Sequence, residues 1–459
     1  MSAPLWTAAE IATATGGRAS ADFAATSVTF DSREVEAGSL FIALKGAATD
    51  GHRFIDEVFA RGAAGAIVST PVDHPHVLVP DTMAALEALG IAARARTGAT
   101  VIGVTGSVGK TGTKEALAAA LERSAPGHVH RSVKSYNNHT GVPLSLARMP
   151  ADSRYAVLEM GMNHAGELAA LTRFVRPHIA IITAIAPAHI EFFDSEEGIA
   201  DAKAEIFQGL EPGGTAIVPF NSRHYARLDA AARQHADTVI SFGLNDGADV
   251  RALETMRTET GGTFVTARLR HSELSFTIGL PGAHWVSNAL AVLAAVEAAG
   301  ADVALAGLAL AEMSDLPGRG ARFMAAVGNG KALVIDESYN ANPTSMRATL
   351  AVLGAEPAAR KIAVLGAMRE LGADSAAYHA DLAEPVVAAG VSHAVLVGDE
   401  MAPLADRLLE HGIDFVHVAD ASAARQALAN VLAPGDAVLV KGSNGVGLAA
   451  VVASLKGQS

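Results

Sequence analysis

The stretch at residues 101–111 constrains the fold of this chain more than any other segment. It reads Val-Ile-Gly-Val-Thr-Gly-Ser-Val-Gly-Lys-Thr, so an apolar strand runs into a glycine-rich turn and then into a helix rich in alanine and leucine. Such a turn directs backbone N–H groups and the positive end of the helix toward a phosphate group. The turn therefore predicts a nucleotide site, and its residues are Thr105, Gly106, Ser107, Val108 and Gly109.

Two side chains that follow the turn add chemistry to it. Lys110 can reach the β- and γ-phosphate oxygens of ATP, and the hydroxyl of Thr111 can ligate Mg²⁺. The strict P-loop spacing needs a glycine where Val104 stands, so the motif is a shortened variant. A tight strand-to-helix turn that serves only packing is the alternative, and the Gly-Lys-Thr sequence in this context disfavours it.

Composition limits the classes of partner. With 459 residues the chain is too long for one ordinary core, and its length suggests about three domains. It carries 35 Lys and Arg against 48 Asp and Glu, and this net charge of −13 argues against nucleic acid and anionic membranes as partners. Because there is no cysteine, disulfides and thiolate chemistry are excluded.

The apolar segments do not predict membrane insertion. The first ten residues lack a basic segment followed by an apolar core, so we expect no signal peptide. The most apolar region, 289–313, is interrupted by Glu297, Gly300 and Asp302, which leaves it short of the ~20 residues of a membrane span. We therefore expect two packed helices there, and a cytoplasmic protein.

Residues 1–98 predict a small α/β unit. Two apolar runs end in polar residues, and the first of these ends includes Ser32 and Arg33. They could form a binding lip, but polar residues favour turns in any case, so solvated turn residues are the preferred interpretation on sequence alone. The expected strands are 28–30, 39–44 and 63–69, and the expected helices are 54–62 and 82–97.

Residues 99–316 place two metal-capable groups at strand ends. The apolar run 155–158 leads into Glu159, and the run 179–183 leads toward His189. Parallel α/β folds carry their chemistry at the carboxyl ends of strands, so these groups indicate a Mg²⁺ site beside the phosphate loop. Taken singly, Glu159 is more simply interpreted as a salt-bridge partner and His189 as a surface histidine.

Other polar residues of this segment are open to two interpretations. Asn137 and Asn138 lie in a polar loop that suits recognition of hydroxyl or phosphate groups, although Asn pairs also form ordinary turns. His284 and Ser287 stand near a helix start, where helix capping competes with contact to a nucleotide base. Lys203 lies on the helix expected over 196–210 and reads as a solvated lysine, since only a carbamate would let it ligate a cation.

A new α/β alternation begins after the Leu-Pro-Gly-Arg-Gly sequence at 316–320. Four apolar strands are separated by helical segments, which is typical of a parallel, doubly wound sheet. The expected strands are 333–335, 362–365, 394–397 and 437–440.

Taken in order, these motifs resemble the Mur ligase family over almost the full chain. The resemblance rests on a series of short motifs rather than on any one of them. They are Phe30-Asp31-Ser32-Arg33, Asp50-Gly51-His52, the phosphate loop, Tyr136-Asn137-Asn138, Glu159-Met160-Gly161, Ala188-His189-Ile190-Glu191, Ala202-Lys203-Ala204-Glu205-Ile206, Ser338-Tyr339-Asn340-Ala341-Asn342-Pro343 and Val440-Lys441-Gly442-Ser443.

The resemblance implies an architecture and a set of residue roles. It implies a UDP-binding domain at 1–98, a P-loop ATP-binding domain at 99–316 and a Rossmann-like domain at 317–459. It implies that Lys110 binds the ATP phosphates, that Thr111 and Glu159 hold one Mg²⁺, and that His189 and a carbamylated Lys203 hold a second. It also implies that Asn288 contacts adenine, Arg319 the phosphates and Asp336 the ribose. The implied UDP-sugar site consists of Ser32, Arg33, Asn137 and Asn138.

Three positions depart from the family pattern. Trp285 lies where an asparagine is common, which removes one contact to adenine unless ring stacking replaces it. His139 replaces a residue that is often acidic, and Gly112 stands where a second threonine is usual. The glycine weakens the start of its helix without removing the phosphate ligands.

The implied reaction is ATP-dependent amide ligation with Mg²⁺ as cofactor. The resemblance implies that D-alanyl-D-alanine is joined to UDP-N-acetylmuramoyl-tripeptide through an acyl phosphate, by a monomer without nucleic-acid partners. Folylpolyglutamate synthase shares the ATP core, but residues 28–54 argue against it. A small-molecule kinase would leave the C-terminal domain unexplained, and a non-catalytic nucleotide-binding protein would not need all of the candidate catalytic residues.

Overall fold

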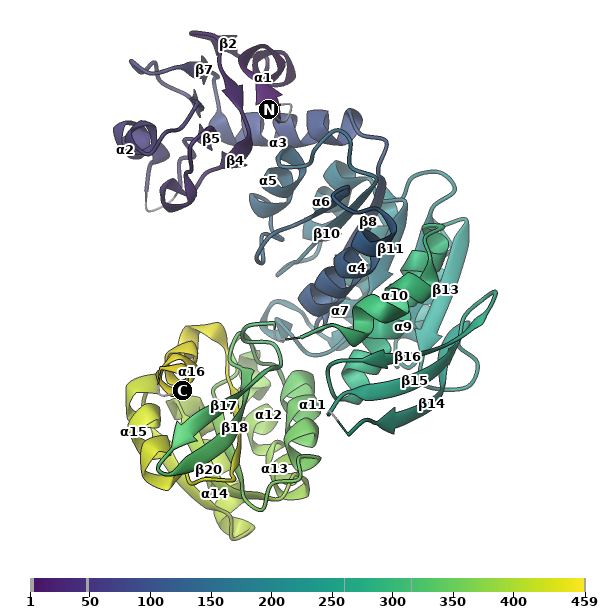
Figure 1. Cartoon of the computed structure of the whole chain (residues 1–459), viewed down its shortest axis with the longest axis vertical. Helices are drawn as coiled ribbons and strands as arrows, with labels where there is room; N and C mark the ends of the chain where they lie inside the picture. The colour runs from purple at the N-terminus through teal and green to yellow at the C-terminus, as the bar shows by residue number, and fades with distance from the viewer. Residues whose placement is uncertain (1–3, 47–48, 260, 315, 458–459) are drawn as a thin grey trace.

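The computed structural model describes residues 4–46, 49–259, 261–314 and 316–457. Three α/β domains follow one another, with the N-terminal domain at one end, the central domain in the middle and the C-terminal domain at the other end (Figure 1). The predicted α/β class with three domains is confirmed. The domain limits 1–98, 99–316 and 317–459 stay predictions, and residues 1–3, 47–48, 260, 315 and 458–459 of these ranges lie outside the described residues.

The N-terminal domain is built on a five-stranded sheet of order β2-β7-β6-β5-β4, beside a two-stranded ribbon of β1 and β3. Helices α1 and α3 cover one face of the sheet, and α2 covers the other. The elements are β1 Trp6–Thr7, α1 Ala8–Thr15, β2 Arg18–Ala19, β3 Ala24–Ala25, β4 Ser27–Thr29, β5 Ser39–Ile42, α2 Ile55–Ala60, β6 Gly65–Val68, β7 His76–Leu78 and α3 Thr82–Ala95, with 3₁₀ turns at Ser32–Glu34 and Gly51–Phe54.

The central domain has a nine-stranded sheet of order β16-β15-β14-β13-β12-β11-β8-β10-β9. Strands β8 to β14 pair in parallel, and β15 and β16 extend the sheet by antiparallel pairing. The elements are β8 Thr100–Thr105, α4 Lys110–Ser124, β9 Val129–Arg131, α5 Gly141–Ala147, β10 Tyr155–Glu159, α6 Glu167–Val175, β11 Ile179–Ile182, α7 Glu196–Ala204, β12 Thr215–Pro219, α8 Tyr225–Ala232, β13 Thr238–Gly243, β14 Val250–Arg257, β15 Thr263–Arg268, β16 Glu273–Ile278, α9 Ala283–Ala298 and α10 Val303–Ala311.

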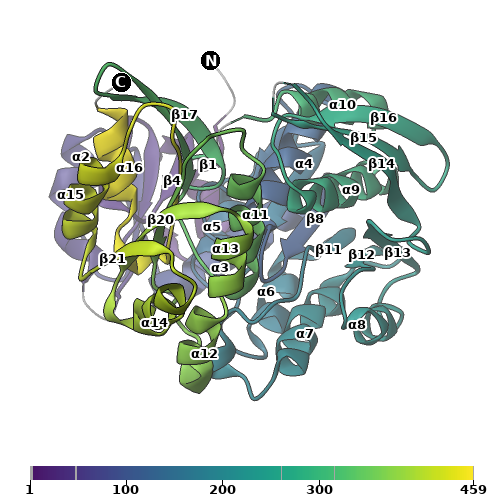
Figure 2. The same cartoon turned by 90° about the horizontal axis from the view of Figure 1, so that it is seen from below.

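Helices cover both faces of the central sheet. Helices α4, α9 and α10 pack on one face, and α5 to α8 pack on the other (Figure 2). This explains why the parallel strands are continuous apolar runs instead of alternating patterns. The expected pair of helices in the most apolar region is confirmed as α9 and α10. Among the described residues, no helix combines the length and apolar character needed to cross a membrane.

The C-terminal domain is a doubly wound six-stranded sheet of order β17-β18-β22-β19-β20-β21. All of its pairs are parallel except that of β17 with β18. Helices cover both of its faces, which confirms the predicted parallel sheet. The elements are β17 Ala321–Val327, β18 Gly330–Glu337, α11 Pro343–Gly354, β19 Lys361–Gly366, α12 Ser375–Ala380, α13 Ala383–Ala388, β20 Val391–Val397, α14 Ala402–Glu410, β21 Asp414–Val418, α15 Ala421–Val431, β22 Ala437–Lys441 and α16 Ala449–Lys456.

One loop of the central domain, residues 133–140, touches both of the other domains. Tyr136 donates a 2.9 Å hydrogen bond to Glu34 of the N-terminal domain, and Lys134 forms an ion pair with the same carboxylate. Ser135 accepts a 2.5 Å hydrogen bond from the hydroxyl of Tyr339 in the C-terminal domain. We call this segment the three-domain loop.

Candidate active site

The glycine-rich turn lies at the carboxyl end of β8, where the strand order of the central sheet reverses. Strand β8 pairs with β10 on one side and β11 on the other, and ligands of open α/β sheets bind at such a reversal. Gly106 and Gly109 have φ angles of 149° and 85°, which side chains rarely allow. A Cβ atom at Gly106 would also lie 2.0 Å from the Thr183 hydroxyl.

The helix that follows the turn begins without a side-chain cap. Gly109 is the N-cap of α4 and offers no acceptor to the first N–H groups of the helix, which remain available to an anion. The Lys110 ammonium donates a 2.6 Å hydrogen bond to the Gly106 carbonyl across the turn. Burial lowers the pKa of Lys110, and the charge of Glu159 opposes this effect. The turn is therefore built as an anion cradle.

Thr111 and Glu159 meet beside this cradle. The Thr111 hydroxyl donates a 2.8 Å hydrogen bond to one Glu159 carboxylate oxygen, and the Asn137 amide donates a 2.7 Å bond to the other. Glu159 ends β10 and is only 2% exposed. Within the described ranges, no three carboxylate or imidazole groups cluster as a metal cage. The Thr111–Glu159 pair nevertheless fits Mg²⁺, which usually takes one or two carboxylates and completes its shell with phosphates and water.

His189 lies after β11, in a left-handed backbone conformation with φ 60°. Its Nδ1 contacts the carboxylate of Glu370, a residue of the C-terminal domain. Burial lowers the pKa of His189 even though Glu370 acts in the opposite direction, so the ring is neutral near pH 7 and its other nitrogen can ligate a metal.

The structure corrects the interpretation of Lys203 that was drawn from the sequence alone. It is only 1% exposed, so it is not a solvated helix lysine, and α7 ends one residue later before a 3₁₀ turn at Glu205–Gly209. Burial and the charge of Lys110 hold the pKa of Lys203 well below its usual value. Its amine makes no hydrogen bond or ion pair with any residue that the structure describes. Burial therefore favours the neutral form of this amine, which is the form that reacts with CO₂ to give a carbamate.

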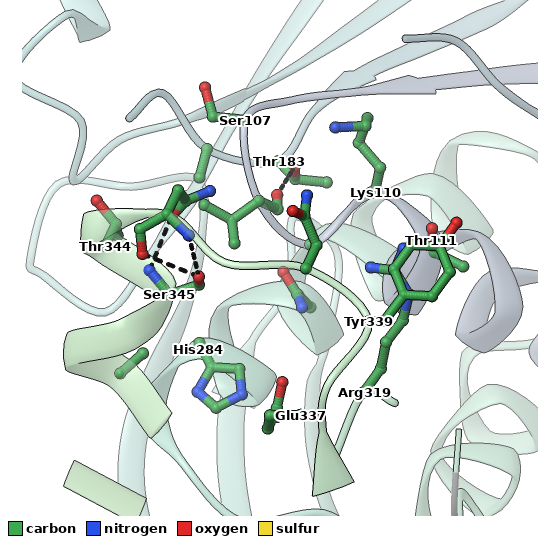
Figure 3. A pocket seen from close by; sticks show the side chains of 18 of the residues that line it. Ser107, Lys110, Thr111, Thr183, His284, Arg319, Glu337, Tyr339, Thr344 and Ser345 are labelled. Carbon is green, nitrogen blue, oxygen red and sulfur yellow. Dashed lines mark hydrogen bonds between the residues drawn. The ribbon is translucent and has the colours of Figure 1, made fainter. Parts of the chain in front are cut away.

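A pocket of about 430 Å³ opens between the central and C-terminal domains. Figure 3 shows Ser107 and Lys110 in the upper part of the view, His284 and Glu337 in the lower part, and Thr111, Tyr339 and Arg319 together at the right. The volume is within the usual range for small-molecule sites. The lining residues include Ser107, Val108, Gly109, Lys110, Thr111, Asn137, Glu159, His189, Asn288 and Arg319 from the predicted set.

The C-terminal domain contributes a cluster of charged side chains to the pocket. The Arg319 guanidinium lies 4.1 Å from the centre of the Tyr339 ring, and Lys441 lies 3.5 Å from Glu337. Burial raises the pKa of Glu337 and lowers the pKa of Lys441, although each partner's charge opposes the shift. The pocket thus combines two cationic side chains from this domain with the phosphate loop.

Asp336, the predicted ribose contact, is not among the lining residues. Its carboxylate accepts hydrogen bonds from the N–H of Gly318 at 3.0 Å and from the N–H and hydroxyl of Ser338 at 3.1 and 2.6 Å. The next residue, Glu337, lines the pocket. Successive side chains of a strand point to opposite faces, so the Asp-Glu pair at the end of β18 can present only one carboxylate to the site.

The predicted UDP-sugar residues divide between two places. Ser32 and Arg33 lie in the 3₁₀ turn after β4, where Arg33 pairs with Asp31 at 2.7 Å. Asn138 accepts hydrogen bonds from the N–H groups of Thr140 and Gly141. Asn137 alone of the four lines the pocket, beside Glu159. No sequence motif predicted the contact between Asn137 and Glu159.

The start of α9 forms another wall of the pocket. Asn288 lies next to Gly109, since a Cβ atom at Gly109 would be 2.8 Å from its side-chain oxygen. His284 and Ser287 do not cap this helix, whose N-cap Gly282 makes no side-chain bond, so the capping explanation is wrong. Both line the pocket, and burial lowers the pKa of His284 to about 4.

Several lining residues were missed at the level of sequence. The prediction named Asp336 instead of its neighbour Glu337, and it included Lys441 only as part of a motif without assigning it a role. Glu370 does not itself line the pocket but contacts His189, which does; it belongs to no motif, although its φ of 61° marks a constrained backbone. Asn342 and Ser345 lie at the start of α11, where they also form the helix cap, and only the motif around Tyr339 pointed to this segment.

Comparison with known proteins points to one family along the chain. Residues 25–128, 104–296 and 321–444 match the family descriptions "Mur ligase family, catalytic domain", "Mur ligase middle domain" and "Mur ligase, glutamate ligase domain". A UDP-N-acetylmuramoyl-tripeptide--D-alanyl-D-alanine ligase of Synechocystis sp. is 34% identical over 95% of this chain and 93% of its own length.

Solved structures agree with the sequence comparison. A crystal structure of MurF from Acinetobacter baumannii superimposes with a TM-score of 0.85 and 33% identity over 98% of both chains. The MurF ligase from Thermotoga maritima in complex with ADP gives a TM-score of 0.78 and 27% identity, over 94% of this chain and 97% of that one.

Proposed function

The chain belongs to the Mur ligase family, and on this premise we propose that it joins D-alanyl-D-alanine to UDP-N-acetylmuramoyl-tripeptide while ATP is converted to ADP and phosphate. The observation that carries the proposal is the interdomain pocket, which brings Lys110, Thr111, Glu159 and Arg319 to one place. This reaction belongs to the synthesis of the peptidoglycan precursor.

In this proposal ATP binds with its phosphates on the glycine-rich turn. The turn from Thr105 to Gly109 would supply backbone N–H groups other than that of Ser107, which donates a 2.8 Å hydrogen bond to the Ala184 carbonyl. Lys110 would offset the charge of the transferred phosphoryl group. Asn288 and His284 would face the adenine, and Arg319 the phosphates. For the ribose we now favour Glu337 over Asp336, because the carboxylate of Glu337 lines the pocket and that of Asp336 is occupied by three protein donors.

Thr111 and Glu159 would hold one Mg²⁺, with the remaining ligands from phosphate oxygens and water. His189 and a carbamate on Lys203 would hold a second. The burial of Lys203 without a partner supports this second site, because an ammonium there would repel a metal ion, whereas a carbamate would supply anionic oxygens. Bound Mg²⁺ would reduce the repulsion between the phosphates and the incoming carboxylate.

The chemistry follows from the poor reactivity of a carboxylate as an acyl donor. A tripeptide carboxylate oxygen attacks the γ-phosphorus of ATP, the bond from that phosphorus to the bridging oxygen breaks, and ADP leaves. The amine of D-alanyl-D-alanine then attacks the carbonyl carbon of the acyl phosphate, loses a proton and expels phosphate. Closure of the two domains that line the pocket would exclude water from the acyl phosphate.

The UDP-sugar of the first substrate would bind at the N-terminal domain. Ser32 and Arg33 are the proposed contacts there, together with Asn138 from the three-domain loop. Asn137 would instead orient Glu159, given its 2.7 Å hydrogen bond to that carboxylate.

A coupled assay of ADP release tests the proposal. We expect ADP release with UDP-N-acetylmuramoyl-tripeptide only when D-alanyl-D-alanine is present, together with an amide product. Lys110→Ala should lower turnover by about 10²-fold or more without loss of fold, as for other electrostatic contacts to a transferring group. A phosphorylated product formed without the dipeptide would show that the protein is a kinase.

A further inference from the structure

Two positions that depart from the family pattern, Gly112 and Trp285, touch each other. Gly112 lies in the first turn of α4, directly after Thr111, and Trp285 lies in the first turn of α9. A Cβ atom at Gly112 would be 2.8 Å from Cη2 and 3.1 Å from Cζ3 of the indole ring. Real Cβ contacts essentially never approach 2.8 Å, so the ring fits here because residue 112 has no side chain.

The opposite edge of the indole faces the C-terminal domain. A Cβ atom at Gly320 would lie 3.8 Å from Trp285 Nε1 and 3.5 Å from the Oε1 of Glu337, so both polar atoms face the same glycine. The ring therefore spans the space between the phosphate-loop helix and Glu337. Trp285 is 6% exposed and, like Gly112 and Glu337, it lines the nucleotide pocket.

The indole N–H is unusual for a buried tryptophan. Within the part of the chain that the structure describes, it donates no hydrogen bond, whereas the other tryptophan, Trp6, donates a 2.7 Å bond to the Ala147 carbonyl. Buried Trp N–H groups normally find a partner, because leaving such a donor unpaired is unfavourable. A free donor on the wall of a pocket is available to a ligand.

We propose that Trp285, seated on Gly112, forms the wall of the nucleotide site between the phosphate loop and Glu337, and that its ring and N–H contact the bound nucleotide. The inference rests on the proposed function, since it takes the pocket to bind ATP. Gly112 and Trp285 then form a matched pair, in which a large aromatic wall replaces a smaller polar side chain and needs the glycine for space.

Tryptophan fluorescence tests the contact directly. The chain has two tryptophans, so the emission of Trp285 is the difference between wild type and Trp285→Phe. We expect saturating ADP to change the wild-type emission and to leave that of Trp285→Phe unchanged, with binding followed in parallel by calorimetry. Trp6→Phe is the matched control, and it should keep both the ADP response and the affinity.

Affinity gives a second readout. We expect Trp285→Ala to raise the Kd for ADP about tenfold or more, in line with aromatic contacts to nucleotides, and Trp285→Phe to have a smaller effect. Circular dichroism should show both variants folded. The inference is wrong if the wild type binds ADP with no change in Trp285 emission, or if Trp285→Ala binds ADP as tightly as wild type. If the wild type does not bind ADP at all, the proposed function fails with it.

The pairing with Gly112 is tested by a double-mutant cycle. Gly112→Ala should weaken ADP binding, because the new methyl group collides with the indole ring. Adding Trp285→Asn to this variant should recover part of the loss by removing the ring. Normal ADP affinity and normal Trp285 emission in Gly112→Ala would show that the two residues are not matched.

Discussion

The hydroxyl of Tyr339 donates a 2.5 Å hydrogen bond to the hydroxyl of Ser135, and this bond joins the C-terminal domain to the three-domain loop. Tyr339 is 37% exposed, and its ring also lies against Arg319. The same side chain therefore contacts a pocket residue, Arg319, and forms the hydrogen bond between the two domains. A link of this kind, at the rim of the pocket, favours the arrangement in which both domains line the site.

Tyr339→Phe should separate this link from overall stability. A single hydrogen bond contributes about 0.5–1.5 kcal/mol, which corresponds to a roughly two- to tenfold change in the population of the linked arrangement. We expect kcat to fall within that range and the melting temperature to change little, since the bond is near solvent. Ser135→Ala should give the same result. Unequal effects of the two variants on kcat would show that the tyrosine acts by another route.

The two neighbouring carboxylates at the end of β18 should respond differently to substitution. Asp336→Asn removes the charge that three donors share in the protein interior, so we expect a loss of about 1–3 kcal/mol in the free energy of unfolding and a small change in the KM for ATP. Glu337→Asp keeps the charge near Lys441 but shortens its reach, so the KM for ATP should rise several-fold at nearly constant stability.

Denaturant unfolding and initial-rate kinetics on both variants decide between them. A raised KM for ATP in Asp336→Asn, with unchanged stability, would indicate that Asp336 and not Glu337 contacts the ribose.

Lys203→Ala should be nearly inactive if the buried amine is a carbamate ligand. Acetate, formate or bicarbonate should restore part of the rate of Lys203→Ala by occupying the vacated ligand position. Lys203→Arg should stay inactive, because arginine keeps a positive charge and forms no carbamate. A ¹³C NMR signal of the carbamate, present in wild type incubated with labelled bicarbonate and missing from Lys203→Ala, provides the direct measurement. Full activity of Lys203→Arg would rule out the carbamate.

His130 should make the protein less stable in mild acid. Burial lowers its pKa to about 4, and its ring contacts the Ser145 carbonyl at 2.7 Å. Between pH 6.5 and 4 the unfolded chain binds a proton at this residue and the folded chain does not, so stability falls as pH is lowered through this window. The shift sets an upper limit of about 3 kcal/mol, which the partial exposure of the ring reduces.

Urea unfolding of His130→Gln across that pH range checks the effect. The variant should show a smaller difference in unfolding free energy between pH 7 and pH 4 than the wild type. His139→Gln, which changes an exposed histidine of the same region, is the matched control and should keep the wild-type difference. Equal pH dependence in His130→Gln and wild type would contradict the prediction.

Local sequence patterns were sufficient for the elements and for much of the site. The apolar strands and the glycine-rich turn are set by short-range chemistry, and the position of Glu159 at the end of β10 follows from the parallel sheet. His189 lies on the loop after β11, which ends at Ile182, rather than at the strand end itself. Tertiary contacts could not be predicted from these local patterns. Lys203 has the helical surroundings of a surface lysine, and only the packing of the domain shows that its amine is buried.

Contacts between domains were the least predictable. Glu370 reaches His189 from 181 residues away, and no motif marks it. The choice between Asp336 and Glu337 depends on which face of β18 meets the pocket, and that depends on the register of the whole C-terminal sheet. Gly112 and Trp285 were each identified in the sequence as a departure from the family pattern, but their contact with each other could not be predicted.

The three-domain loop has a consequence for the engineering of chimeric ligases. Exchanging the N-terminal domain for that of a relative would separate Glu34 from Lys134 and Tyr136, and exchanging the C-terminal domain would separate Tyr339 from Ser135. The same loop carries Asn137, the partner of Glu159. A crossover at either domain boundary would therefore disturb the Glu159 carboxylate as well, unless the loop and its two distant partners were transplanted as one unit.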